Sequence, residues 1–133
     1  MSDDPMRILV VEPTKDPYVK EIDGSLASMQ AIVGGFIQAV EPFDDPNVLL
    51  LCNEEAKLLG LQENRFLRNR NGIPYDIIHG TFFLAHGSGE EFCSLTDKQI
   101  QTYVRLYSRE KLFVMQHGKV INQPKKGKST HER

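Results

Sequence analysis

The chain has 133 residues, of which 40% are hydrophobic and 26% are charged, and its formal net charge is -2. This length and composition are typical of one globular domain, and they exclude a collagen-like or wholly disordered chain. Because the net charge is close to zero, overall electrostatics favour neither nucleic acid nor an anionic membrane as a partner.

The apolar runs and the cysteines indicate the compartment. The longest uninterrupted apolar runs have four or five residues, far fewer than the roughly 20 that a membrane-spanning helix needs. Asp3, Asp4 and Arg7 interrupt any N-terminal secretory stretch, and the two cysteines, Cys52 and Cys93, form no CxxC pair. We therefore expect a cytoplasmic protein that does not span a membrane.

The N-terminal third predicts a hairpin, a helix and a further strand. Residues 8–11 are apolar at every position, as in a strand buried inside a sheet, and residues 18–22 resemble an antiparallel return strand nearer an edge. Ser25 can cap a helix that begins at the next residue, and the glycines at 34–35 stop it. Residues 36–40 then predict the third strand.

The most apolar stretch of the chain, residues 48–52, predicts a fourth strand that ends in a run of amides, carboxylates and arginines. Within residues 58–67 we expect a short helical turn after Gly60. Residues 76–85 predict one long strand, in which Gly80 marks a bulge or a close approach of the backbone to a neighbour.

The clearest local signal marks the start of a second helix. Thr96 fits the N-cap, Gln99 fits the capping-box position, and Leu95 and Ile100 can form a hydrophobic staple. The apolar stripe that follows at helical spacing consists of Ile100, Tyr103, Val104 and Tyr107. Such a stripe predicts a helix that covers a sheet.

Together these elements predict an α+β domain over residues 1–122, with a small, mostly antiparallel sheet of about five strands that two helices cover. Residues 113–121 complete the domain as a hairpin or a docked extension. Residues 123–133 contain Pro, Gly, Ser and several basic residues but no large apolar side chain, which predicts a disordered basic tail.

Polar residues after the strand at 48–52 are the candidates for a binding site. They are Asn53, Glu54, Asn64, Arg65 and Thr81. An arginine can bond to a carboxylate or phosphate with two N–H groups, and asparagine can both donate and accept. The alternative is a solvated turn, in which Arg65 is a surface residue that pairs with Glu54 or Glu63 and adds little stability.

Two kinds of chemistry are open as further alternatives. Glu54 or Glu55 could act with His79 in general acid–base catalysis, as in a small hydrolase or transferase. The residues that could bind zinc are Cys52, His79, His86 and Cys93. Because no two of these four lie two to five positions apart, the spacing argues against a zinc site. We expect no metal and no cofactor.

Five segments carry a family resemblance. They are residues 6–13 (MRILVVEP), 19–24 (VKEIDG), 29–35 (MQAIVGG), 52–61 (CNEEAKLLGL) and 75–83 (YDIIHGTFF). In this order they resemble the family of bacterial and phage domains of unknown function numbered 3846, over about residues 6–107. The resemblance implies a gene carried by a phage or a conjugative element of a bacterial host, and it supplies no catalytic residues.

These observations favour a small non-enzymatic binding protein that counteracts host defence. It would sequester a ligand, for example a nucleotide signal, or block a host protein. The alternatives are the acid–base enzyme described above and a nucleic-acid-binding accessory protein that uses the basic tail. Self-association into a homo-oligomer stays open.

Overall fold

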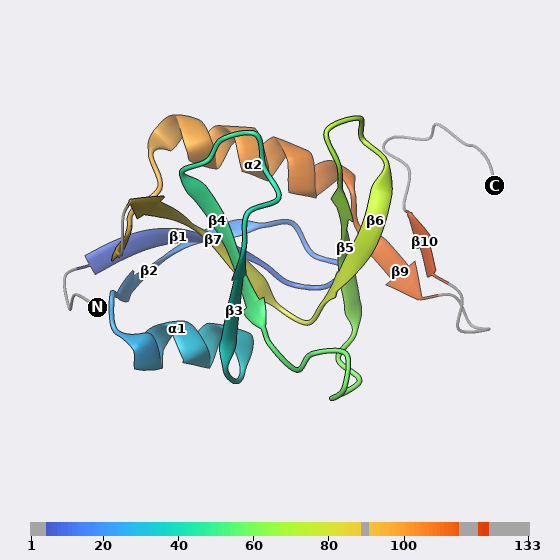
Figure 1. Ribbon diagram of the computed structural model, residues 1–133, viewed down its shortest axis with the longest axis horizontal. Coiled ribbons are helices and arrows are strands. Elements are labelled where there is room, and N and C mark those ends of the chain that lie inside the picture. The colour runs from blue at the N-terminus through green and yellow to red at the C-terminus, as the bar shows by residue number, and fades with distance from the viewer. Residues whose placement is uncertain (1–4, 89–90, 115–119, 123–133) are drawn as a thin grey trace.

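The computed structural model describes residues 5–88, 91–114 and 120–122 of the chain. These residues form ten strands and two helices. In chain order they are β1 (Pro5–Val11), β2 (Tyr18–Asp23), α1 (Leu26–Val33), β3 (Ile37–Val40), β4 (Val48–Asn53), β5 (Glu63–Arg68), β6 (Pro74–His79), β7 (Phe82–Ser88), β8 (Glu91–Cys93), α2 (Asp97–Arg109), β9 (Leu112–Val114) and β10 (Val120–Asn122) (Figure 1).

Six strands form the main sheet, in the order β2-β1-β7-β4-β3, with β8 paired to β7. Every pairing in this sheet is antiparallel. Two smaller sheets consist of β5 with β6 and of β9 with β10. The α+β class and the antiparallel sheet predicted from the sequence are confirmed, and so is the edge position of β2.

The two helices cover opposite faces of the main sheet (Figure 1). In β1, Ile8 and Val10 pack in the core cluster that contains Met29 of α1, whereas Leu9 and Val11 pack in the cluster that contains Tyr103 of α2. Successive side chains of a strand point to opposite faces, so a strand between two helices must be apolar at every position. This explains the unbroken apolar runs in the sequence.

Both helices begin where the sequence predicts. The Ser25 side chain accepts a hydrogen bond from the Ser28 N–H, and Gly34 ends α1 with a φ of 79°. At α2 the Thr96 hydroxyl accepts from the Gln99 N–H at 3.1 Å, and the Gln99 side chain accepts from the Thr96 N–H at 2.9 Å. The predicted capping box is confirmed.

The segment after Gly60 differs from the sequence prediction. The short helical turn expected there is wrong, because the chain continues into β5, which pairs with β6. The seven residues between β4 and Leu61 instead form hydrogen-bonded turns, in which the Leu61 N–H donates to the Ala56 carbonyl at 3.0 Å. Pairing with β6 satisfies the backbone of β5 more fully than an isolated helical turn would.

Residues 76–85 form two strands and not the single strand that we predicted. β6 ends at His79 and β7 begins at Phe82, and between them Gly80 has a φ of 78°. A Cβ atom at Gly80 would lie 2.7 Å from Leu61 Cδ1. The expected close approach at Gly80 is therefore confirmed, and the same glycine redirects the chain from the β5–β6 hairpin into the main sheet.

The C-terminal elements pair as a hairpin, in agreement with the prediction for residues 113–121. The tail expected at residues 123–133 lies outside the described residues. Within the described ranges, no helix is both long enough and apolar enough to cross a membrane.

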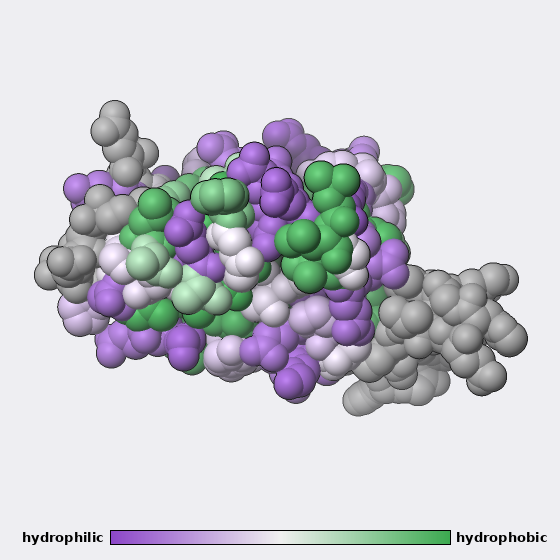
Figure 2. All heavy atoms as spheres, turned by 90° about the horizontal axis from the view of Figure 1, so that it is seen from below, coloured by the Kyte–Doolittle hydropathy of each residue, from purple (hydrophilic) through white to green (hydrophobic). Residues whose placement is uncertain are grey.

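Apolar patches interrupt a largely polar surface. Figure 2 shows such patches, in green, on the lower face of the molecule, with polar residues between them. Among the described residues, the large apolar side chains that are exposed are Tyr18, Val19, Leu26, Phe36, Leu58, Leu59, Ile73 and Tyr75. Leu58 and Leu59 belong to the β4–β5 loop, which borders the candidate site.

Candidate functional site

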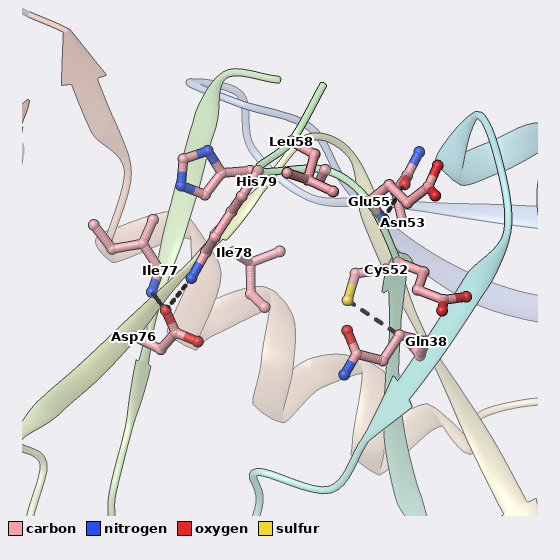
Figure 3. A pocket seen from close by; sticks show the side chains of 12 residues that line it. Gln38, Cys52, Asn53, Glu55, Leu58, Asp76, Ile77, Ile78 and His79 are labelled. Carbon is pink, nitrogen blue, oxygen red and sulfur yellow. Dashed lines mark hydrogen bonds and ion pairs between the residues drawn. The ribbon is translucent and has the colours of Figure 1, made fainter. Parts of the chain in front are cut away.

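A cleft lies where β4 ends, between the β4–β5 loop and β6 (Figure 3). We call it the β4–β6 cleft, and its volume is about 180 Å³. Its polar lining residues are Gln38, Asn53, Glu54, Glu55, Lys57, Asp76 and His79, and its apolar ones are Cys52, Ala56, Leu58, Ile77 and Ile78. Two of the five predicted site residues, Asn53 and Glu54, are among them.

Asn53 is a buried residue of the cleft that stabilises the adjoining loop. Its side chain is buried, with 4% exposed. Its Nδ2 donates to the Val33 carbonyl at the end of α1, at 3.1 Å, and its Oδ1 accepts from the Glu55 N–H at 2.7 Å. A Cβ atom at Gly35 would lie 2.9 Å from Asn53 Nδ2, so the glycine makes room for this amide. Asn53 thus fixes the start of the β4–β5 loop to α1.

Glu54 and Glu55 carry the carboxylates of the cleft, and both residues are exposed. The loop that holds them is ordered by its own backbone, because the Leu59 N–H donates to the Glu55 carbonyl at 2.9 Å. The Glu54 N–H donates to the Phe36 carbonyl at 2.8 Å. Neither carboxylate has a hydrogen bond or an ion pair with another described residue, so both can bond to a ligand.

Lys57 and Asp76 close one side of the cleft with an ion pair of 2.5 Å that joins the loop to β6. The Lys57 ammonium lowers the pKa of the Asp76 carboxyl, and the Ile77 N–H, which donates to the same carboxyl at 2.8 Å, lowers it further. The opposite charges of Lys57 and Asp76 offset each other. The net negative charge of the cleft therefore comes from Glu54 and Glu55.

His79 has one ring nitrogen fixed and one free. Its Nδ1 lies 2.9 Å from the Leu61 carbonyl oxygen. A carbonyl oxygen only accepts, so Nδ1 carries the hydrogen, and in the neutral ring Nε2 bears the lone pair. Nε2 has no hydrogen-bond partner among the described residues. His79 can thus accept a proton or a hydrogen bond from a ligand in the cleft.

Asn64 lies outside the cleft and is fully buried. Its Nδ2 donates to the Val11 carbonyl at 2.9 Å and to the Gly80 carbonyl at 2.8 Å. A register shift between Glu63 and Arg65 makes Asn64 the bulged residue of β5. The bulge lets Asn64 join β5 to the end of β1 and to the glycine before β7.

Arg65 is also fully buried, so the expectation of a surface arginine paired with Glu54 or Glu63 is wrong. Its Nε and Nη2 donate to the Tyr107 carbonyl at 3.1 and 2.8 Å, and Nη2 also donates to the Lys15 carbonyl at 2.6 Å. Its Nη1 donates to the Asn64 carbonyl at 3.3 Å and to Asn64 Oδ1 at 2.7 Å. These bonds engage all five N–H groups of the guanidinium.

Arg65 therefore acts as an internal link between β5, the β1–β2 turn and the last turn of α2. Burial lowers the pKa of Arg65 to about 10, which still leaves the side chain protonated at neutral pH. The free carbonyls at a helix C-terminus favour a positive charge, and Tyr107 presents one of them. Any contact of Asn64 and Arg65 with a ligand would need these bonds to break, so their effect on binding would be indirect.

Thr81 lines a neighbouring hollow of about 350 Å³, together with Asn53, Gln62 and residues of α1. Asn64 bonds to the carbonyl of the residue before Thr81, at 2.8 Å. Of the five predicted site residues, Asn53 and Glu54 line the cleft, Asn53 and Thr81 line the hollow, and Asn64 and Arg65 line neither. Binding by these five residues stays a prediction.

The sequence analysis missed Lys57, Asp76 and Gln38 as cleft residues. Lys57 and Asp76 are 19 positions apart and belong to different elements, so no local spacing pointed to their pairing. An opposite-charge pair flanking the β5 segment was the only signal that could have suggested it.

The four candidate zinc ligands do not come together at one place, although His86 and Cys93 are paired across β7 and β8. Cys52 is buried in β4, where its thiol lies 3.7 Å from the Gln38 carbonyl, and burial raises its pKa. His86 is close to Gln99, and Cys93 is exposed on β8. Across the described ranges, no three His, Cys, Asp or Glu side chains are grouped so as to hold a metal ion.

The sequence of the chain was compared with models of protein families. The family model described as Domain of unknown function (DUF3846) matches residues 6–108. The chain belongs to this family. The match covers the same segments that carry the resemblance in the sequence, from β1 to the end of α2. Neither a curated protein nor a solved structure matches the chain.

Proposed function

We propose that this DUF3846 chain is a small non-enzymatic binding protein of a phage or mobile genetic element, and that it counteracts host defence by holding a small molecule or a host protein at the β4–β6 cleft. The mobile-element context rests on the family resemblance. The binding role rests on the cleft itself.

One observation carries the proposal: the polar groups of the cleft divide into supports and free groups. Asn53, Lys57 and Asp76 use their hydrogen bonds within the protein. The carboxylates of Glu54 and Glu55 and the Nε2 of His79 have no hydrogen-bond or ion-pair partner among the described residues. Fixed supports around unengaged polar groups are what a preformed ligand site requires.

The charge of the cleft restricts the ligand. Lys57 pairs with Asp76, so the carboxylates of Glu54 and Glu55 have no compensating charge within the cleft. They repel phosphate, and they favour a group with N–H donors or a positive charge. A basic segment of a host protein or an amine fits this cleft better than a nucleotide does. The exposed Leu58 at the rim can add apolar contact with such a segment.

The proposal can be tested by capture from bacterial cells. Tagged wild-type protein and the double variant Glu54→Gln, Glu55→Gln would be purified side by side and compared by native mass spectrometry and quantitative proteomics. The matched control is Glu21→Gln, which changes an exposed glutamate on the edge strand β2. We expect one molecule or protein to accompany the wild type and the control but not the double variant. The same captured species on all three proteins would contradict the proposal.

A second candidate function is general acid–base catalysis by Glu54 or Glu55 with His79. The observation in its favour is that all three residues line one cleft, with Nε2 of His79 unprotonated in the neutral ring. Incubation with a small-molecule extract of bacterial cells tests it. Consumption of a compound by the wild type but not by His79→Gln would support an enzyme, whereas equal consumption by both proteins would exclude this role for His79.

A further inference from the structure

A second cavity lies apart from the β4–β6 cleft. Its lining residues come from the β3–β4 loop, the C-terminal half of α2, and β5 with the turn that follows it. These elements lie near one another at the upper edge of the ribbon in Figure 1. Its volume is about 410 Å³, within the range of small-molecule sites. No residue of the cleft lines this cavity.

Two buried tyrosines line this cavity. Tyr103 is 7% exposed and Tyr107 is 3% exposed. Neither hydroxyl has a hydrogen-bond partner in the part of the chain that the structure describes. Buried tyrosine hydroxyls are normally bonded, so these two residues of the cavity lining have hydroxyls that can still bond to a ligand.

Both hydroxyls are protonated at neutral pH and can therefore donate. Burial, together with the nearby Asp45 and Asp44, raises the pKa of Tyr103 to about 12. Burial also raises the pKa of Tyr107. A ligand with acceptor atoms, such as the ring nitrogens and carbonyls of a nucleobase, can accept hydrogen bonds from these hydroxyls.

The remaining lining residues provide aromatic surface and charge. Phe43 packs on Tyr103 with ring centroids 4.6 Å apart, and Phe66 of β5 also lines the cavity. Arg70, in the hairpin turn, has no ion pair with a described residue. Arg68 lies beside it and is paired with Glu110 at 3.0 Å, so that pair is neutral. Asp44 also lines the cavity. It belongs to the β3–β4 loop, whereas Arg70 belongs to the β5–β6 turn.

We propose that this cavity binds a nucleoside monophosphate, with the base among the aromatic rings, the hydroxyls of Tyr103 and Tyr107 bonded to it, and the phosphate at Arg70. Aromatic side chains stack on bases, and arginine binds phosphate with two parallel N–H groups. Asp44 accepts hydrogen bonds only, so it favours a base with an amino group. The site is independent of the β4–β6 cleft and of the function proposed for it.

Calorimetric titration with the four nucleoside 5′-monophosphates tests the proposal. We expect saturable binding by the wild type, with uridine monophosphate weakest because its base has no amino group. Arg70→Gln should weaken binding about tenfold to a hundredfold, and Tyr103→Phe or Tyr107→Phe about twofold to tenfold. The matched controls Arg105→Gln and Tyr75→Phe, both at exposed positions, should bind as the wild type does.

Three results would overturn the proposal. The first is that none of the four nucleotides binds. The second is that nucleosides without phosphate bind as tightly as the nucleotides, which would remove the role of Arg70. The third is that each Tyr→Phe variant is clearly less stable to urea without ligand, because the hydroxyls would then have protein partners. Unchanged stability together with weakened binding supports the proposal.

Discussion

Two polar pairs follow strand β4 at close sequence distance, and they occupy opposite environments. Asn64 and Arg65 are fully buried, and their N–H groups all bond to carbonyls or to each other. Glu54 and Glu55 are exposed on an ordered loop, and their carboxylates have no partner among the described residues. The comparison teaches that polar side chains after β4 stabilise the fold in one place and remain without protein partners on an exposed loop in another.

Arg65→Ala is expected to have the largest effect on stability. The substitution leaves the buried carbonyls of Tyr107 and Lys15 without donors and opens a void beneath α2, so the free energy of unfolding should fall by about 3 kcal/mol or more. Urea denaturation measures this loss. Arg105→Ala, which truncates an exposed arginine on α2, should change stability by no more than about 0.5 kcal/mol. Equal stabilities of the two variants would refute the internal role of Arg65.

Asn53→Ala should have the next largest effect. It removes the side-chain amide that bonds to the Val33 carbonyl and to the Glu55 N–H. Because this amide is buried, we expect the free energy of unfolding to fall by about 1 to 3 kcal/mol. The matched control is Asn71→Ala, at an exposed position of the β5–β6 turn. Hydrogen exchange should also show faster exchange of the Leu59 and Leu61 amides in Asn53→Ala. Unchanged protection of these amides would show that Asn53 does not hold the loop.

Thr96→Ala tests a group that is exposed, as Glu54 and Glu55 are, but that is hydrogen-bonded within the protein, as Asn64 and Arg65 are. Loss of the N-cap hydroxyl should lower the free energy of unfolding by about 1 kcal/mol. Thr102→Ala, an exposed substitution further along α2, serves as the comparison. A thermal melt in which both variants behave as the wild type would argue against the contribution of the cap.

Asp76→Asn should have the smallest effect, and one that depends on pH. Because Lys57 lowers the pKa of the folded carboxyl, the ion pair stabilises the fold above about pH 4 and loses this effect as the pH falls through the folded pKa. The variant should therefore be less stable than the wild type at pH 7, and the difference should shrink in acid. A difference that stays constant between pH 7 and pH 2 would contradict this assignment.

Local patterns in the sequence were sufficient for most of the fold. The capping residues Ser25 and Thr96 and the apolar run that became β4 each carry their signal within a few positions, and the structure confirms all three. The two errors arose where the partner is distant. β5 becomes a strand through pairing with β6, and the break at Gly80 follows from contact with Leu61.

The environment of the site residues could not be predicted for the same reason. Arg65 bonds to carbonyls 42 and 50 positions away, and nothing near it in the sequence identifies these acceptors. In sequence, Asn64 and Arg65 resemble Glu54 and Glu55, because each pair is a polar dipeptide followed by an apolar residue. Only the packing of α2 and the β1–β2 turn shows that the first pair is a buried link, whereas the second pair is exposed.

The claim that the β4–β6 cleft is a binding site is tested most directly by NMR. Amide spectra of the labelled protein would be recorded with and without the species captured by the wild type from bacterial cells. We predict shift changes concentrated at residues 54–58 and 76–79, and none of that pattern in the Glu54→Gln, Glu55→Gln double variant. Shift changes that leave both segments unaffected, in a protein that still binds the captured species, would contradict the claim.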